Sequence, residues 1–220
     1  MSLRDELGRI AGDVLQAAWV QAQRLGTMGP RSRRARQFAA FGAGSAICFP
    51  ITALYGERHI VIGKGTVIGP NLSLSAGVSP EQDLGAEVLV RIGDRCLIGR
   101  GSGIVAHESI DIGDDVFTGH HVYITDANHG YADPLVPVGL QFGEARPVSI
   151  GSGSWLGHGT VVLPGARIGR HVVVGAGSVV TGDLPDFCVA VGNPARVVRR
   201  YVRGDGWIDV RMPPAVASDA

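Results

Sequence analysis

The sequence has few aromatic residues, few cysteines and no excess charge of either sign. Aromatic residues make up 6% of the 220 residues, and the three cysteines, Cys48, Cys96 and Cys188, are widely scattered. An odd, dispersed set of cysteines favours neither a disulfide framework nor a metal cluster. The formal net charge is zero, which argues against nucleic acid as the main partner. No signal peptide and no stretch long enough to span a bilayer is visible, so we expect a cytoplasmic protein.

Glycine, by contrast, is abundant, with 33 residues, and it recurs in a phrase six residues long. The phrase contains an aliphatic residue, usually a glycine next, and a small or aliphatic residue four positions after the first. Its copies begin at Ile62, Ile68, Leu74, Ile92, Ile98, Ile104, Ile112, Thr118, Ile124, Ile150, Leu156, Val162, Ile168 and Val174. A fixed period that is longer than a strand alternation and shorter than a helical repeat indicates a solenoid.

Three such units close one triangular coil of roughly 18 residues, and stacked coils bury a continuous aliphatic column. Small residues are predicted to point into the narrow interior, namely Thr66, Cys96, Ser102, Ser154, Thr160, Ala166 and Ser178. Trp155 is too large for that interior and should face outward, over a ligand or a neighbouring subunit. A β-sandwich is the alternative fold, but it would alternate apolar residues at period two. We therefore predict an all-β solenoid over residues 44–192.

The two ends of the chain lack the repeat. Leu7, Ile10 and Val14 recur at helical spacing, so residues 1–43 are predicted to form an N-terminal helical cap or extension. Its polar face mixes both charges, which favours a packing cap or a subunit contact over a membrane-surface helix.

At the other end, Asn193 and Pro194 provide an N-cap and a first-turn proline. They predict a short C-terminal helix over residues 193–203, followed by a tail over residues 204–220.

The largest break in the repeat is a predicted loop over residues 130–147, and a loop of that length is usually functional. His129 stands at its beginning, and histidine is well suited to general-base catalysis at neutral pH. A solvated loop histidine is the alternative interpretation. Asp126 and Glu144 are close in sequence and either orient the imidazole or are simply solvated. His107 lies about one coil earlier; paired histidines invite a zinc interpretation, which we do not favour.

A second group of residues lies in the later repeats. His158 and Ala176 are 18 positions apart and flanked by glycines, so they are predicted to stack at one corner of successive coils. Backbone groups exposed there can follow an extended ligand. Arg196 and Arg199 are candidates for contacts with its phosphates. The alternative interpretation is that these glycines only allow the chain to turn at the corners of the coil.

Several motifs together resemble those of the left-handed parallel β-helix acyltransferases, in particular the maltose and galactoside O-acetyltransferase group. These motifs are Asn128-His129 before a loop, Gly143-Glu144 with Pro147, Ser154-Trp155-Leu156-Gly157, Gly175-Ala176-Gly177-Ser178-Val179-Val180-Thr181 and Gly192-Asn193-Pro194-Ala195-Arg196. The resemblance covers roughly residues 44–203 and implies a left-handed coil, which spacing alone would not give. It also implies a homotrimer with acyl-CoA bound between subunits.

The resemblance further implies roles for individual residues. His129 matches the catalytic base, and Glu144 falls where a carboxylate follows it. The positions that line the CoA groove are Trp155, His158, Ala176, Thr181, Arg196 and Arg199. Acceptor contacts are expected from His107, Asp126 and Asn128. Two departures stand out, because Gly182 replaces a basic residue and His107 replaces the aspartate of sugar-specific relatives.

The sequence therefore predicts an acetyl-CoA-dependent O-acyltransferase that modifies a hydroxyl of a sugar or other small acceptor, with no metal and no membrane span. Two alternatives remain. A zinc enzyme of the γ-carbonic anhydrase type shares the solenoid but needs three convergent histidines. A non-catalytic β-helix that serves as an assembly subunit needs none of these residues.

Overall fold

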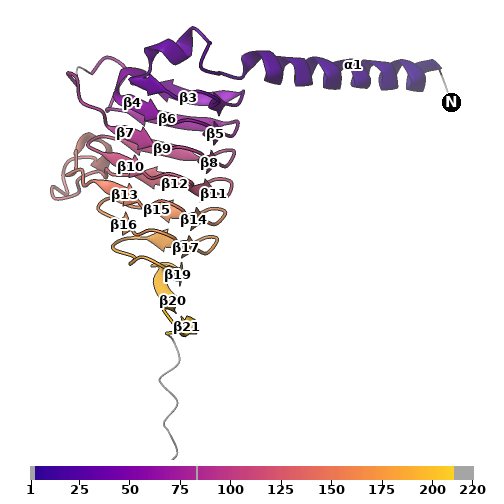
Figure 1. Cartoon of the computed structure of the whole chain (residues 1–220). Coiled ribbons are helices and arrows are strands. Elements are labelled where there is room, and N and C mark those ends of the chain that lie inside the picture. Colours follow the sequence, from indigo (N-terminus) through magenta and orange to yellow (C-terminus); the bar gives the residue numbers. More distant parts are fainter. Residues whose placement is uncertain (1–2, 83, 211–220) are drawn as a thin grey trace, which may run out of the picture.

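The computed structural model describes residues 3–82 and 84–210. Most of this chain is wound into a stack of coils that runs from the N-terminal to the C-terminal end (Figure 1). A long helix, α1 (Leu3–Gly26), projects sideways from the first coil, and two antiparallel strands extend the last one.

Successive strands are distributed in rotation over three sheets, named A, B and C below. Sheet A contains β2 (Ala46–Ile47), β5 (Val67–Ile68), β8 (Leu97–Ile98), β11 (Phe117–Thr118), β14 (Trp155–Leu156), β17 (Val173–Val174), β19 (Cys188–Val191), β20 (Arg196–Val202) and β21 (Gly206–Asp209). Sheet B contains β1 (Ala40–Phe41), β4 (Ile60–Ile62), β7 (Val90–Ile92), β10 (Ile110–Ile112), β13 (Val148–Ile150) and β16 (Arg167–Ile168). Sheet C contains β3 (Ile51–Tyr55), β6 (Leu72–Ala76), β9 (Gly103–Ala106), β12 (Tyr123–Thr125), β15 (Val161–Val162) and β18 (Val179–Val180). All pairs between coils are parallel, so the three sheets fit the predicted solenoid over the described residues.

The repeat forms this stack because each short strand turns one aliphatic side chain inward. Neighbouring coils pair in register, so that Ile92, Ile112 and Ile150 lie one above another. Every residue that begins a predicted repeat is at most 3% exposed, and so are the predicted small inward residues. Glycine follows the aliphatic residue because adjacent coils touch at the corner. A Cβ at Gly99, for example, would overlap the backbone of Gly119.

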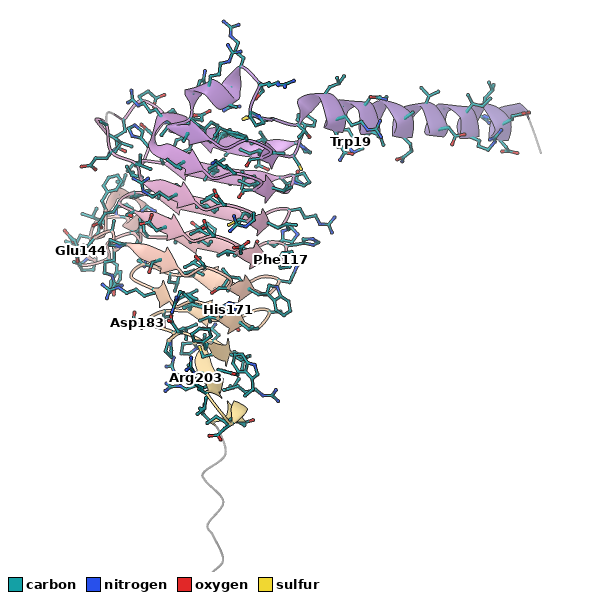
Figure 2. The ribbon with its side chains drawn as sticks, in the orientation of Figure 1. Trp19, Phe117, Glu144, His171, Asp183 and Arg203 are labelled. Carbon is teal, nitrogen blue, oxygen red and sulfur yellow. The ribbon has the colours of Figure 1, made fainter. Side chains whose placement is uncertain are left out.

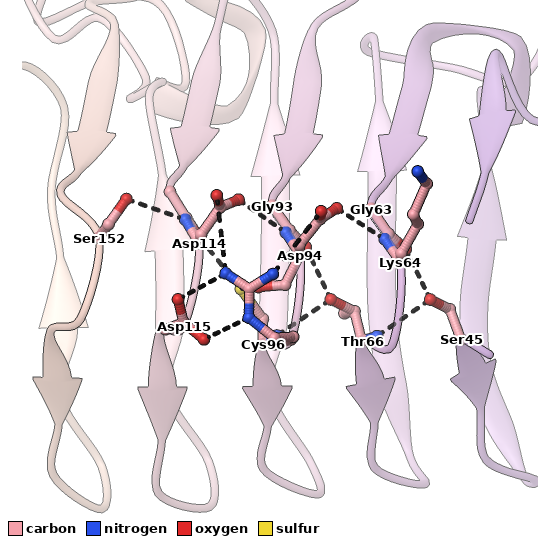
Figure 3. A network of polar contacts seen from close by, with 12 residues as sticks. Ser45, Gly63, Lys64, Thr66, Gly93, Asp94, Cys96, Asp114, Asp115 and Ser152 are labelled. Atoms are coloured by element: carbon pink, nitrogen blue, oxygen red, sulfur yellow. Dashed lines mark hydrogen bonds and ion pairs between the residues drawn. The ribbon is translucent and has the colours of Figure 1, made fainter. Parts of the chain in front are cut away.

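The corner between sheets B and A contains a ladder of polar contacts from coil to coil (Figure 3). The Thr66 hydroxyl donates to the Gly93 carbonyl oxygen at 2.6 Å and accepts from the Cys96 backbone N–H at 3.0 Å. The Cys96 thiol in turn donates to the Gly113 carbonyl oxygen at 3.1 Å. Burial raises the pKa of the Cys96 thiol, which keeps it a donor. These small inward side chains therefore satisfy backbone groups that the narrow corner would otherwise leave unpaired.

Helix α1 forms where the N-terminal periodicity predicts it, but it does not cover the solenoid. Leu7 and Val14 are each 61% exposed. Its contact with the body includes the tilted pair of Trp19 and Phe49, whose ring centroids are 6.2 Å apart. The open end of the aliphatic column is covered instead by Met28, Ala35 and Phe38, which follow the helix and are buried. The cap is thus formed by the segment after the helix, which includes the short 3-10 helix η1 (Arg34–Gln37).

The predicted C-terminal helix over residues 193–203 is wrong. Asn193 and Pro194, joined by a cis peptide bond, lie in the turn between β19 and β20 instead of starting a helix. Strand β20 pairs antiparallel with β19 because the last coil leaves an open sheet edge whose backbone groups need partners. The predicted tail begins with residues that form β21, and its residues 211–220 lie outside the described part.

The predicted loop over residues 130–147 is found between β12 and β13 and contains one turn of 3-10 helix, η3 (Val138–Leu140). Another short 3-10 helix, η2 (Glu57–His59), precedes β4. In the part of the chain that the structure describes, no helix has both the length and the apolarity needed to cross a membrane.

Candidate functional site

A cavity of about 440 Å³ lies on the outer face of sheet C, beside the long loop. It is lined by Val78, Val105, His107, Tyr123, Thr125, Ala127, Asn128, His129, Phe142, Val161 and Leu163. The floor consists of outward residues of β9, β12 and β15, since Tyr123 pairs with Val161 and Thr125 with Val105. The cavity thus has a largely apolar floor with a few polar groups at one side, as small-molecule sites commonly do.

His129 is positioned by the start of the loop, which folds back as a narrow hairpin. The Gly130 N–H donates to the Gln141 carbonyl oxygen at 2.8 Å, and the Gly143 N–H donates to the Asn128 carbonyl oxygen at 3.1 Å. His129 itself forms a bridge with Phe142. These contacts hold Asn128 and His129 at the cavity wall, where the sequence predicts a reactive histidine.

His107 reaches the same cavity from the preceding coil. It follows β9 directly, at the corner where sheet C leads to sheet B. The structure therefore brings together three of the predicted residues, His107, Asn128 and His129. Two imidazoles and an amide beside an apolar floor can exchange protons with a bound hydroxyl group and orient it.

The predicted contact of Asp126 with the acceptor is not found. Asp126 is completely buried and does not line the cavity. Its carboxylate accepts backbone N–H groups from His107, Glu108 and Ser109 at 2.8, 2.8 and 2.7 Å. A buried carboxylate requires such donors, so Asp126 is engaged with the backbone instead of a ligand.

Glu144 is also outside the cavity. It is exposed at the outer edge of the loop (Figure 2). Its predicted catalytic role stays a prediction.

Trp155, His158 and Ala176 form a second group on another face of the solenoid, away from the cavity lining. Trp155 faces outward from sheet A and is 48% exposed, as its size predicts. His158 and Ala176 stack at the corner between sheets A and C, because the Gly177 N–H donates to the His158 carbonyl oxygen at 2.8 Å. Thr181, Arg196 and Arg199, which belong to the same predicted groove, are all exposed.

The corner between sheets A and C also brings together three histidines. The ring centroid of His158 lies 6.3 Å from that of His120 and 5.5 Å from that of His121. If His120 and His121 were in a strand, their side chains would point to opposite faces. Both lie in a corner instead, and His121 has a left-handed backbone conformation with φ 58°. Across residues 3–82 and 84–210, no three His, Cys, Asp or Glu side chains are arranged to hold a metal ion.

The apolar floor of the cavity was missed by the sequence analysis. Tyr123 and Val161 are the residues immediately before the inward Ile124 and Val162, so each must face outward on sheet C. That signal was present in the repeat. Phe142 had no comparable signal, because its position depends on how the loop folds.

The six-residue repeat and the three sheets of stacked parallel strands define a β-solenoid protein of the hexapeptide-repeat class. Residues 147–182 match the family described as bacterial transferase hexapeptide (six repeats). Residues 89–125 match the hexapeptide repeat of succinyl-transferase.

Individual relatives agree with this class. The chain is 35% identical over 136 residues to the putative lipopolysaccharide biosynthesis O-acetyl transferase WbbJ of Escherichia coli, covering 59% of this chain and 69% of WbbJ. It is 41% identical over 113 residues to the galactoside O-acetyltransferase of Lactococcus lactis, covering 48% of this chain and 54% of that enzyme. The chain therefore belongs to the hexapeptide-repeat acetyltransferase family, as its motifs predict.

A solved structure shows the shared fold. The N-acyltransferase AntD of Bacillus cereus, in complex with dTDP and 3-hydroxybutyryl-CoA, superimposes with a TM-score of 0.65. The match covers 80% of this chain and 92% of AntD at 21% sequence identity.

Proposed function

We propose that this protein transfers an acetyl group from acetyl-CoA to a hydroxyl of a saccharide or other small acceptor, with His129 as general base. The observation that carries the proposal is the cavity in which His129, His107 and Asn128 meet. The family membership supports it, since the relatives are named O-acetyltransferases.

In the proposed reaction the acceptor hydroxyl binds beside His129, and the imidazole removes its proton as the oxygen attacks the thioester carbonyl. A new C–O bond forms, the C–S bond breaks, and the proton passes to the leaving thiolate. A backbone N–H at the A–C corner, for which we propose that of His158, stabilises the oxyanion. Asn128 and His107 orient the acceptor.

The residues at the A–C corner fit an extended thioester ligand. Around Gly159 and Gly177 a Cβ would find no heavy atom within 4 Å, so the backbone there is open to a ligand. Trp155 is available for stacking, and Arg196 and Arg199 are exposed near the end of the solenoid. Arginine forms bidentate contacts with phosphate, so we assign these residues, with Thr181, His158 and Ala176, to CoA.

The proposed donor and acceptor residues lie on different faces of one chain. We therefore propose a homotrimer of left-handed solenoids, in which sheet A of one subunit faces the cavity of the next. Trp155 would then reach the partner's cavity. Exposed apolar side chains on sheet A, including Leu97 and Phe117, suit such a contact.

The test is a thiol-release assay with acetyl-CoA and a panel of acceptors. The panel contains galactose, maltose, p-nitrophenyl galactoside, a 6-deoxy sugar and a simple alcohol. Relative to the unaltered chain, H129A should lower kcat by roughly 10²–10⁴-fold while binding of CoA and the thermal midpoint stay nearly unchanged. H171A is the matched control, because His171 is exposed at the corner between sheets B and A, outside the cavity, and stacks on Phe187.

Three results would contradict the proposal. Full turnover by H129A would remove His129 from the chemistry. Stoichiometric zinc in the purified protein would favour the carbonic anhydrase alternative. Failure to bind acetyl-CoA at equilibrium would favour an assembly subunit.

A further inference from the structure

Asp126 occupies a position where the same column contains small apolar residues in the coils before it. β9 pairs in register with β6, so Ala106 lies next to Ala76. Thr125 pairs with Val105, and Asp126, the next residue, follows β12 as Ala106 follows Val105 in β9. All three are buried. An alanine would satisfy the packing at this level, and burial of a carboxylate is costly unless it is hydrogen-bonded. The charged residue is therefore not explained by the solenoid itself.

The contacts of Asp126 connect three segments around the cavity. Its Oδ1 accepts the N–H of His107, and its Oδ2 accepts those of Glu108 and Ser109. These three residues directly follow β9. Its own carbonyl oxygen accepts the N–H of Arg146 at 2.7 Å, where the long loop returns. One side chain thus fixes the corner that presents His107, while the same residue anchors the end of the loop that begins at His129.

We infer that Asp126 is a positioning residue of the acceptor site, which holds the His107 backbone so that its imidazole lines the cavity beside His129. The inference rests on the proposed transferase function. Asp126 does not touch the cavity, so it acts through His107. A small displacement of a group that orients a substrate can reduce turnover by roughly 10²-fold, which gives the expected scale of its effect.

Replacement by asparagine tests this arrangement with little change of shape. The amide has one acceptor oxygen, so it can serve either the Glu108 and Ser109 N–H groups or the single His107 N–H. Keeping the larger number of hydrogen bonds places the NH2 group against the His107 N–H. D126N should therefore release His107 in particular while most of the corner is retained.

The experiment compares D126N, H107A and the double variant, using acetyl-CoA and the panel acceptor with the highest turnover. Each single variant should lower kcat/KM for the acceptor by roughly 10–100-fold and raise the acceptor KM, leaving the KM for acetyl-CoA unchanged. The double variant should have about the same kcat/KM as the less active single variant, because both substitutions remove the same interaction. D94N is the matched control: Asp94 also accepts a backbone N–H of a neighbouring coil, that of Lys64 at 2.8 Å, at a corner outside the cavity.

The outcomes separate this inference from the proposed function. If the effects of D126N and H107A multiply in the double variant, or if D126N matches the unaltered chain, Asp126 does not act through His107. If the unaltered chain acetylates no acceptor, the proposed function fails instead. In that case, or if D126N does not fold, amide hydrogen exchange of the unaltered chain tests whether Asp126 holds the backbone of residues 107–109. The amides of His107, Glu108 and Ser109 should exchange as slowly as those of β9, and rapid exchange overturns the inference.

Discussion

Sheets A and B carry the same kind of side chain on their inner faces but different kinds on their outer faces. Inside, both contribute buried aliphatic residues, such as Ile98 in sheet A and Ile92 in sheet B. On the outside, sheet A presents the exposed apolar residues Val67, Leu97, Phe117 and Trp155. The same outward position in sheet B is occupied by the half-buried Val61 and then by Arg91, Asp111, Ser149 and Arg167.

This difference shows at which positions the repeat restricts the type of residue. The inward residue must fill a narrow column in every coil, so it is similar in all three sheets. The outward residue meets nothing within its own coil and is free to serve assembly or chemistry. The exposed apolar row on sheet A, compared with the mostly polar row on sheet B, supports the proposed subunit contact through sheet A.

The largest expected effect tests the shared inner face. I98A and I92A should each lower the free energy of unfolding by roughly 2–5 kcal/mol, because each removes packed methyl groups from the same column. Urea denaturation followed by circular dichroism measures both. A loss below about 1 kcal/mol for only one of them would show that the two sheets are not equivalent inside.

The next effect tests the difference between the outer faces. L97D places a charge on the apolar row of sheet A and should reduce the mass of the proposed trimer to that of a monomer. S149D places the same charge on sheet B and should leave the mass unchanged. Sedimentation velocity distinguishes these results; an unchanged mass for L97D would exclude sheet A as the contact, and dissociation by S149D would place the contact on sheet B.

The smallest effect concerns the corner that joins the two sheets. Two hydrogen bonds of 2.7 Å from the Arg95 guanidinium hold the pKa of the Asp115 carboxyl below its usual range. A lowered folded-state pKa stabilises the fold above the unfolded pKa, and this contribution is lost as pH falls through the folded value. D115N should therefore be slightly less stable than the unaltered chain at pH 7, and the gap should close in acid. Urea midpoints at pH 7 and below about pH 4 measure this; a gap that widens in acid would contradict it.

Much of the fold and part of the site could be predicted from the sequence. The position of the inward residues, the outward Trp155 and the long loop after Thr125 all follow from the six-residue period and its largest break. His129 follows from its place at that break. His107 could be placed near it only to within about one coil, and the structure now puts both in one cavity.

Other features could not be predicted, because they depend on groups far apart in the chain. Asn193 and Pro194 are compatible with a helix start, but the open edge of β19 favours a strand. Asp126 looks like a site residue in the sequence, whereas the backbone of the preceding coil takes up its carboxylate.

The sequence by itself determined the coil, because every repeat places an aliphatic residue in the same narrow column and a glycine where adjacent coils touch. Only the tertiary structure decided which outward residues share a face. That choice depends on how coils of unequal length, separated by the long loop, stack in register. For that reason His129 and Trp155, both conspicuous in the sequence, lie on different faces of the same solenoid.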